Sequence, residues 1–177
     1  MNFTQIILDF AKWQKYLAEH SELLIVIVVS LFFLSVLSSK VSNKILLILY
    51  LIVMLYMTLL NRNPHSSRNA WFRIFATYQY FLTNAYLRRE ILNNIILFIP
   101  LGTIVARLWP RWRRLIVPVM VSVAIELLQF ITKRGFFETD DIISNSIGGI
   151  IGFSAAMLFL YAKSVLQRHY PLKKKEQ

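Results

Sequence analysis

Five long apolar runs limit what this chain can fold into. They are Leu23–Ser39, Lys44–Leu60, Ile91–Leu108, Leu115–Ile131 and Ile142–Tyr161. A helix that crosses the apolar core of a bilayer needs about 17–25 mostly apolar residues. We therefore predict an all-α membrane protein with about five transmembrane helices, built as one multi-pass domain over residues 23–166. Because Pro100 and Pro118 interrupt the third and fourth runs, four helices and a re-entrant segment are the alternative.

The composition fits a membrane protein and excludes several other classes. Hydrophobic residues make up 56% of the chain, and charged residues make up only 16%, against about a quarter in soluble domains. The net charge of +11 lies mostly between the apolar runs, where basic residues contact anionic lipid headgroups. We therefore expect no nucleic-acid partner. The chain has no cysteine and only three histidines, far apart in sequence, so we expect no disulfide, no cofactor and no metal site.

Three further segments flank or join the runs. In residues 1–22, apolar side chains recur at helical spacing with charged residues between them, which predicts an amphipathic helix lying on the membrane. The connector 61–90 is rich in aromatic residues and arginines, and Tyr and Trp favour the headgroup zone. We expect this connector to be interfacial. Residues 167–177 form a basic tail.

Lysines and arginines divide almost evenly between the two sides of the membrane. With five spans, nine of them fall on the side of residues 1–22, 61–90 and 132–141, and eleven fall on the opposite side. Positive charge favours the cytoplasmic side, but nine against eleven does not decide the orientation. The densest clusters, Arg111–Arg114 and Lys173–Lys175, lie on the second side, which we therefore favour as cytoplasmic.

Polar side chains inside the last two runs follow one helical face. The fourth run carries Ser122, Glu126 and Gln129, with Lys133 just after its end, and the fifth carries Asn145, Gly148 and Gly152, with Asp141 just before its start. Each set has offsets of 0, 4, 7 and 11, which place its members on one face. Polar groups inside a membrane are costly and usually mark function. Small residues spaced as in Gly148 and Gly152 let a second helix approach closely.

The polar residues also fall at one depth in the membrane, just below the side that carries residues 1–22, 61–90 and 132–141. The candidate ligand-binding residues are Arg62, Asn94, Glu126, Gln129, Arg134, Asp140, Asp141 and Asn145. Simpler interpretations exist: the asparagines and aspartates also suit helix caps. Glu126 is also the candidate catalytic residue. A carboxylate this deep is either protonated or paired with an arginine, and a purely structural ion pair is the competing interpretation.

Several stretches resemble one known family. Asn93–Gly102 (NNIILFIPLG) resembles the N-I-L-L-F-I-P-L-G motif of VanZ-like membrane proteins. Ile125–Gln129 is similar to the family's I-E-x-x-Q, and Arg134–Gly148 to its R-x-x-D-x-x-D-x-x-x-N-x-x-G ending. Tyr56–Arg62 is similar to a weaker T-L-x-x-R element. Together the motifs cover about residues 50–155. One departure is that Phe137 and Glu138 stand where the family often has an aspartate.

The resemblance implies a polytopic bacterial membrane protein linked to tolerance of glycopeptide antibiotics such as teicoplanin. It implies no known reaction. Within the matched region we expect a group of proline and glycine residues to serve helix packing. These residues are Pro100, Gly102, Gly148, Gly149 and Gly152.

Three functions are compatible with these features. The first, which we favour, is a binding or modulating protein whose polar pocket engages a membrane lipid, a lipid-linked cell-wall precursor or a lipophilic glycopeptide. The second is an enzyme acting on a lipid headgroup, with Glu126 as general base or an oxygen-rich Mg²⁺ site. The third is a proton-coupled transporter using Glu126, which would need a dimer because the chain has no internal repeat. The sequence does not specify an oligomeric state. We favour a protein that is not an enzyme.

Overall fold

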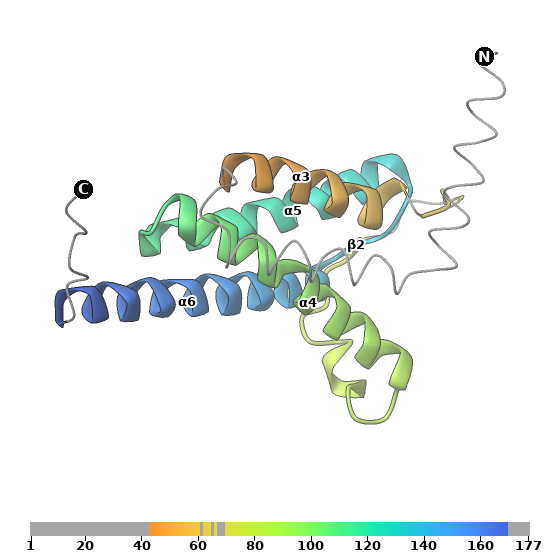
Figure 1. Cartoon of the computed structure of the whole chain (residues 1–177). Coiled ribbons are helices and arrows are strands. Elements are labelled where there is room, and N and C mark those ends of the chain that lie inside the picture. Colours follow the sequence, from red (N-terminus) through yellow and green to blue (C-terminus); the bar gives the residue numbers. More distant parts are fainter. Residues whose placement is uncertain (1–42, 61, 65, 67–69, 170–177) are drawn as a thin grey trace, which may run out of the picture.

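The structure is a computed structural model that describes residues 43–60, 62–64, 66 and 70–169. Four long helices make up most of this part of the chain (Figure 1). They are α3 (Asn43–Leu55), α4 (Ala85–Leu108), α5 (Ile116–Thr132) and α6 (Thr139–His169). The shorter elements are η1 (Tyr56–Leu60), β1 (Ala70–Trp71), η2 (Tyr78–Tyr80), η3 (Trp112–Leu115) and β2 (Phe137–Glu138).

Four helical segments are long and apolar enough to cross a membrane. They are Asn43–Leu60, Ala85–Leu108, Trp112–Thr132 and Thr139–Arg168. The prediction of an all-α membrane protein is therefore confirmed, with helices at four of the five predicted spans. The remaining predicted span, Leu23–Ser39, lies outside the described residues, as do the amphipathic segment 1–22 and most of the basic tail. Pro100 and Pro118 both lie inside continuous helices, so neither run is re-entrant.

Two helices begin earlier than the apolar runs predicted. α4 starts at Ala85, six residues before Ile91, because the Asn84 side chain caps it by accepting hydrogen bonds from the backbone N–H groups of Tyr86 and Leu87. Its first turns contain charged residues that the apolar criterion excluded. In Figure 1 this beginning of α4 and the turn before it project away from the other helices. α6 starts at Thr139, three residues before Ile142.

Glycines bring α4 and α6 into close contact. A methyl group built on Gly148 would lie 2.0 Å from the carbonyl oxygen of Ile95, and one on Gly152 would lie 1.9 Å from that of Ile99. Both partners are backbone atoms that cannot rotate away. Thr103 adds a cross-helix hydrogen bond of 3.2 Å from its hydroxyl to the Gly152 carbonyl. The two helices therefore pack backbone against backbone, as small residues permit in membranes.

The remaining packing glycines and prolines lie in the same region. A methyl group on Gly102 would lie 2.1 Å from the Gly149 carbonyl oxygen, and one on Gly149 would lie 2.4 Å from Pro118 Cβ. Pro100 is buried inside α4. Below them, the apolar core contains the large side chains of Tyr50, Phe98, Leu101 and Phe153. The Tyr50 hydroxyl donates a hydrogen bond to the Leu97 carbonyl and so joins α3 to α4.

The outward faces of the helices remain apolar. Ile48 on α3, Met120 and Ile131 on α5, and Leu158 on α6 are each more than half exposed. In a soluble protein an apolar surface of this extent would be a liability. Around four membrane-length helices it is the surface that lipid tails cover.

The two connectors on one side of the bundle are paired. β1 pairs with β2 in parallel, with Ala70 opposite Phe137 and Trp71 opposite Glu138. The rings of Phe72 and Phe137 are 5.6 Å apart. The segments 70–84 and 133–138 therefore lie on the same side, which we call the connector face. The opposite side, with residues 109–115, is the arginine face.

Candidate functional site

Polar side chains on α5 and α6 meet as successive rungs inside the bundle. Asn145 Nδ2 donates a 3.0 Å hydrogen bond to Ser122 Oγ, and both residues are buried. One helical turn nearer the connector face, Glu126 and Asp141 interact electrostatically. Because the two helices are antiparallel, the same offset of four residues along each helix brings these pairs together. The one-face pattern seen in the sequence is therefore an inter-helix contact.

Glu126 holds the strand β2 rather than facing open space. Its side chain is only 1% exposed. Its Oε2 accepts a 3.0 Å hydrogen bond from the backbone N–H of Glu138. Glu126 therefore fixes where the Glu138 backbone lies.

Arg62 is the cation that acts on this group of carboxylates. It interacts electrostatically with Glu126, Glu138 and Asp141. Asp141 also forms a side-chain hydrogen bond with Asn94 on α4. Arg62, Asn94, Glu126 and Asp141, four of the predicted site residues, are thus in one group. We call these four residues together with Glu138 the carboxylate cluster.

Glu138 titrates near neutral pH. Its pKa is raised from the ordinary value of 4.5 to about 7, chiefly because burial disfavours the charged form. The negative charges of Asp141, Glu90 and Asp140 raise the pKa further, while Arg62 opposes them. The cluster therefore changes its charge in the physiological pH range.

Asp140 holds the connector against the start of α6. Its Oδ1 accepts from the backbone N–H of Phe75 at 2.6 Å, and its Oδ2 accepts from that of Thr77 at 2.7 Å. Phe75 has a positive φ of 62°, a conformation that costs energy for a residue with a side chain. A second tie joins the Tyr78 hydroxyl and Ser144 Oγ at 2.7 Å. Both carboxylate oxygens of Asp140 are therefore engaged in structure.

Arg134 and Gln129 tie α5 to the end of the first described span. The Arg134 guanidinium donates to the carbonyl oxygens of Leu60 at 3.1 Å and of Arg62 at 2.9 Å. Gln129 Nε2 donates to the Thr58 carbonyl at 3.1 Å. Carbonyl groups at a helix end need such donors, and the π-helical turn Tyr56–Leu60 presents them here. Arg134 and Gln129 therefore position the end of the Asn43–Leu60 span.

Two buried acceptor oxygens in this region have no donor among the described residues. They are Gln129 Oε1 and Asn145 Oδ1. The amide nitrogens of both side chains are bonded, so the orientation of each amide is defined by that bond. Buried polar groups without partners are rare in folded proteins, and ordered water often satisfies them.

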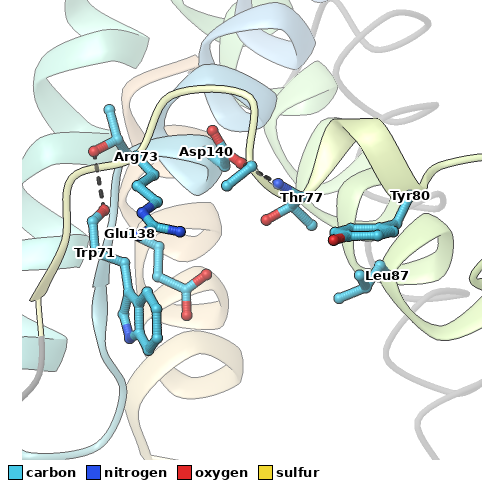
Figure 2. A pocket seen from close by; sticks show the side chains of 9 residues that line it. Trp71, Arg73, Thr77, Tyr80, Leu87, Glu138 and Asp140 are labelled. Carbon is cyan, nitrogen blue, oxygen red and sulfur yellow. Dashed lines mark hydrogen bonds between the residues drawn. The ribbon is translucent and has the colours of Figure 1, made fainter.

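A hollow opens at the connector face next to the carboxylate cluster. It has a volume of about 270 Å³. It is lined by Trp71, Arg73, Ala76, Thr77, Tyr80, Leu87, Glu138, Thr139 and Asp140. Figure 2 shows Arg73, Glu138 and Trp71 on one side of the hollow, with Tyr80 and Leu87 on the other. The hydroxyl of Thr139 donates a 3.1 Å hydrogen bond to the Trp71 carbonyl oxygen.

The structure separates the predicted site residues into two groups. The carboxylate cluster contains four of them, whereas Gln129, Arg134, Asp140 and Asn145 bond to backbone or to neighbouring side chains. The described residues contain no set of three or more His, Cys, Asp or Glu side chains arranged to hold a metal ion. Sequence analysis did not identify Arg73 and Trp71 as site residues, and their only signal was the aromatic and basic composition of the connector.

Comparison with known proteins identifies the same family as the sequence motifs. The family model described as VanZ/LLP1 matches residues 47–160, which is more than half of the chain. Protein VanZ from Enterococcus faecium is 29% identical over 121 residues, which is 64% of this chain and 72% of that protein. No solved structure matches this chain.

Proposed function

Since these matches show that the chain belongs to the VanZ/LLP1 family, as its motifs predicted, we propose that it lowers the susceptibility of a bacterium to glycopeptide antibiotics such as teicoplanin. In this proposal it acts as a multi-pass protein of the cell membrane. It lowers glycopeptide susceptibility by binding a lipid or a lipid-linked component of the cell envelope at the connector face.

The hollow is the observation that carries this proposal. It lies at the end of the membrane-spanning helices, where lipid headgroups would be found, and it combines an arginine with aromatic side chains. The same connector also carries exposed apolar residues, including Phe72 and Leu82. An arginine suits a headgroup phosphate, and the apolar residues suit the acyl region.

Binding is favoured over catalysis by the environment of Glu126. The residue is buried, and its carboxylate bonds to the backbone of β2. Among the described residues, the lining of the hollow includes no histidine, serine or cysteine that would form an activated nucleophile. In this proposal Glu126 positions Glu138 and does not touch the ligand.

Glycopeptide susceptibility tests the proposal directly. A susceptible bacterium would express wild type, Arg73→Gln, Glu126→Ala or Glu126→Gln, with membrane abundance measured by immunoblot. We expect wild type to raise the inhibitory concentration of teicoplanin, and Arg73→Gln and Glu126→Ala to lose most of that protection. Glu126→Gln should keep it, because the amide oxygen still accepts the bond from the Glu138 N–H. Arg89→Gln, an exposed arginine outside the hollow, is the matched control.

Two results would argue against this function. If wild type gives no protection at normal abundance, the proposed role in glycopeptide tolerance is wrong. If Glu126→Gln loses protection as fully as Glu126→Ala, the negative charge itself is required. The general-base and proton-carrier functions would then be favoured over binding.

A further inference from the structure

Deepening the proposed function, on which this inference rests, we propose that the hollow takes a lipid headgroup carrying both a phosphate and a primary ammonium group. An aminophospholipid such as phosphatidylethanolamine has this chemistry. The inference depends on the size of the hollow, on its two opposite charges and on the acidic groups behind one of them.

The size of the hollow favours a headgroup over a larger ligand. Pockets for drug-sized molecules have volumes of about 300–1,000 Å³. The hollow, at about 270 Å³, lies just below that range. A phosphate with a short amino-alcohol fits such a space, whereas a whole glycopeptide is several times larger. The bound group is therefore the polar end of a molecule whose remainder lies outside the hollow.

Arg73 supplies the site for the phosphate. Its guanidinium stays charged at every physiological pH and presents donors in a planar fork that matches phosphate oxygens. It lines the hollow, and Figure 2 shows its side chain on the same side as Glu138 and Trp71. The nearby carboxylate of Asp140 does not compete for it, because both of its oxygens bond to the backbone of the connector.

Glu138 supplies the site for the ammonium group. Its side chain lines the same hollow as Arg73, and its backbone is fixed by Glu126. The negative charges of Asp141, Glu90 and Asp140 act on its carboxyl group, and the positive charge of Arg62 opposes them. This side of the hollow therefore carries an excess of negative potential when its carboxylates are ionised. A headgroup with phosphate alone would be repelled there, whereas an ammonium group would be attracted.

A primary ammonium suits this site better than a quaternary one. A primary ammonium has three N–H donors that a carboxylate can accept, whereas a choline group has none. Choline is instead held by several aromatic faces around the cation. Here Trp71 and Tyr80 lie on opposite sides of the hollow, and Glu138 lies on the Trp71 side (Figure 2). Ethanolamine-type headgroups should therefore be preferred over choline-type ones.

Lipid binding by the purified full-length chain tests the inference. The chain in detergent micelles would be titrated with short-chain phosphatidylethanolamine, phosphatidylglycerol and phosphatidylcholine of one acyl length, with binding read by native mass spectrometry. We expect phosphatidylethanolamine to bind at least about tenfold more tightly than either of the others. Free O-phosphoethanolamine should bind more weakly than the lipid. Equal binding of the free compound would overturn the lipid as the source of the headgroup.

Variants assign the two charges. Arg73→Gln should weaken phosphatidylethanolamine binding by about tenfold or more, which is the scale of losing one charge-assisted hydrogen bond. Glu138→Gln should remove the preference over phosphatidylglycerol. Arg89→Gln, the matched control, should bind as wild type does. The inference is overturned if phosphatidylglycerol binds as tightly as phosphatidylethanolamine, or if the Arg73 and Glu138 variants both bind like wild type.

The two proposals fail separately. A chain that selects phosphatidylethanolamine but leaves teicoplanin susceptibility unchanged overturns the proposed function and supports the headgroup assignment. A chain that protects cells without selecting this headgroup overturns the headgroup assignment alone.

Discussion

Asp140 controls the shape of the connector through two hydrogen bonds to backbone N–H groups. Asp140→Asn keeps one acceptor oxygen and loses the other, so one of the Phe75 and Thr77 N–H groups loses its bond. A hydrogen bond to a charged group contributes about 1.5–3 kcal/mol. We expect faster hydrogen–deuterium exchange in residues 72–78 and little change in α5. Arg89→Gln, a change at an exposed position outside the hollow, serves as control, and equal protection in Asp140→Asn and wild type would contradict the assignment.

Glu138 makes stability depend on pH. Because its pKa is raised from 4.5 to about 7, the folded chain holds this proton more tightly than the unfolded chain does. Stability is highest when the group is protonated in both states, and it falls as the pH rises from about 4.5 to 7. We expect the thermal midpoint in detergent to fall between pH 5 and pH 8.

The variant Glu138→Gln isolates the contribution of this group. The chain contains other acidic groups, so the difference between the two pH profiles is the informative quantity. Wild type should lose more stability than Glu138→Gln across this window. Parallel profiles for the two proteins would show that Glu138 has an ordinary pKa in the folded chain.

At the scale of elements, the contact between α4 and α6 depends on glycine. Gly148→Ala would place a methyl group 2.0 Å from the Ile95 carbonyl oxygen, so the helices would have to separate. Overpacking typically costs about 1–3 kcal/mol, and backbone partners place this case at the upper end. We expect a clear fall in the thermal midpoint in detergent. Ala155→Leu, on an exposed position of the same helix, should change it little, and equal effects would contradict the packing assignment.

The helices were predictable because burial in lipid imposes a length and a composition. Four predicted runs match four described helices, and what the apolar criterion missed were their charged ends. The start of α4 depends on the cap at Asn84, and the start of α6 follows directly on β2. Neither feature changes the mean hydropathy of a membrane-length stretch of residues. The predicted starts of these two helices therefore differ from the observed ones, whereas the existence of the helices was predicted correctly.

The candidate site was predictable only where residues share a helical face. Offsets along each helix placed Glu126 and Asp141 on polar faces, and their common depth grouped them with Asn94 in the prediction. The hollow was not predictable, because it depends on the pairing of β1 with β2 across more than 60 residues of sequence. That pairing places Trp71 opposite Glu138, and two-residue strands leave no periodic signal.

For the whole molecule, the paired connectors define two faces that differ in charge and chemistry. The carboxylate cluster and the hollow lie at the connector face. Arg111, Arg113 and Arg114 lie at the arginine face, and each is exposed. At this face the Arg114 guanidinium forms a cation–π contact with Trp109, at 5.9 Å from the ring centre. The functional proposal therefore requires the connector face to be on the side of the membrane where the envelope component is available.

Single-cysteine labelling measures this arrangement, because the chain has no cysteine of its own. Ser66→Cys and Lys133→Cys report on the two connectors of one face, and Arg111→Cys reports on the other. Positive charge near helix ends favours the cytoplasmic side. We therefore expect an impermeant maleimide to label Cys at 66 and 133 in intact cells, and Cys at 111 only after permeabilisation. The reverse pattern would turn the hollow towards the cytoplasm and restrict its ligand to inner-leaflet lipids. Labelling of 66 and 133 from opposite sides would contradict the pairing of β1 with β2, and with it the hollow itself.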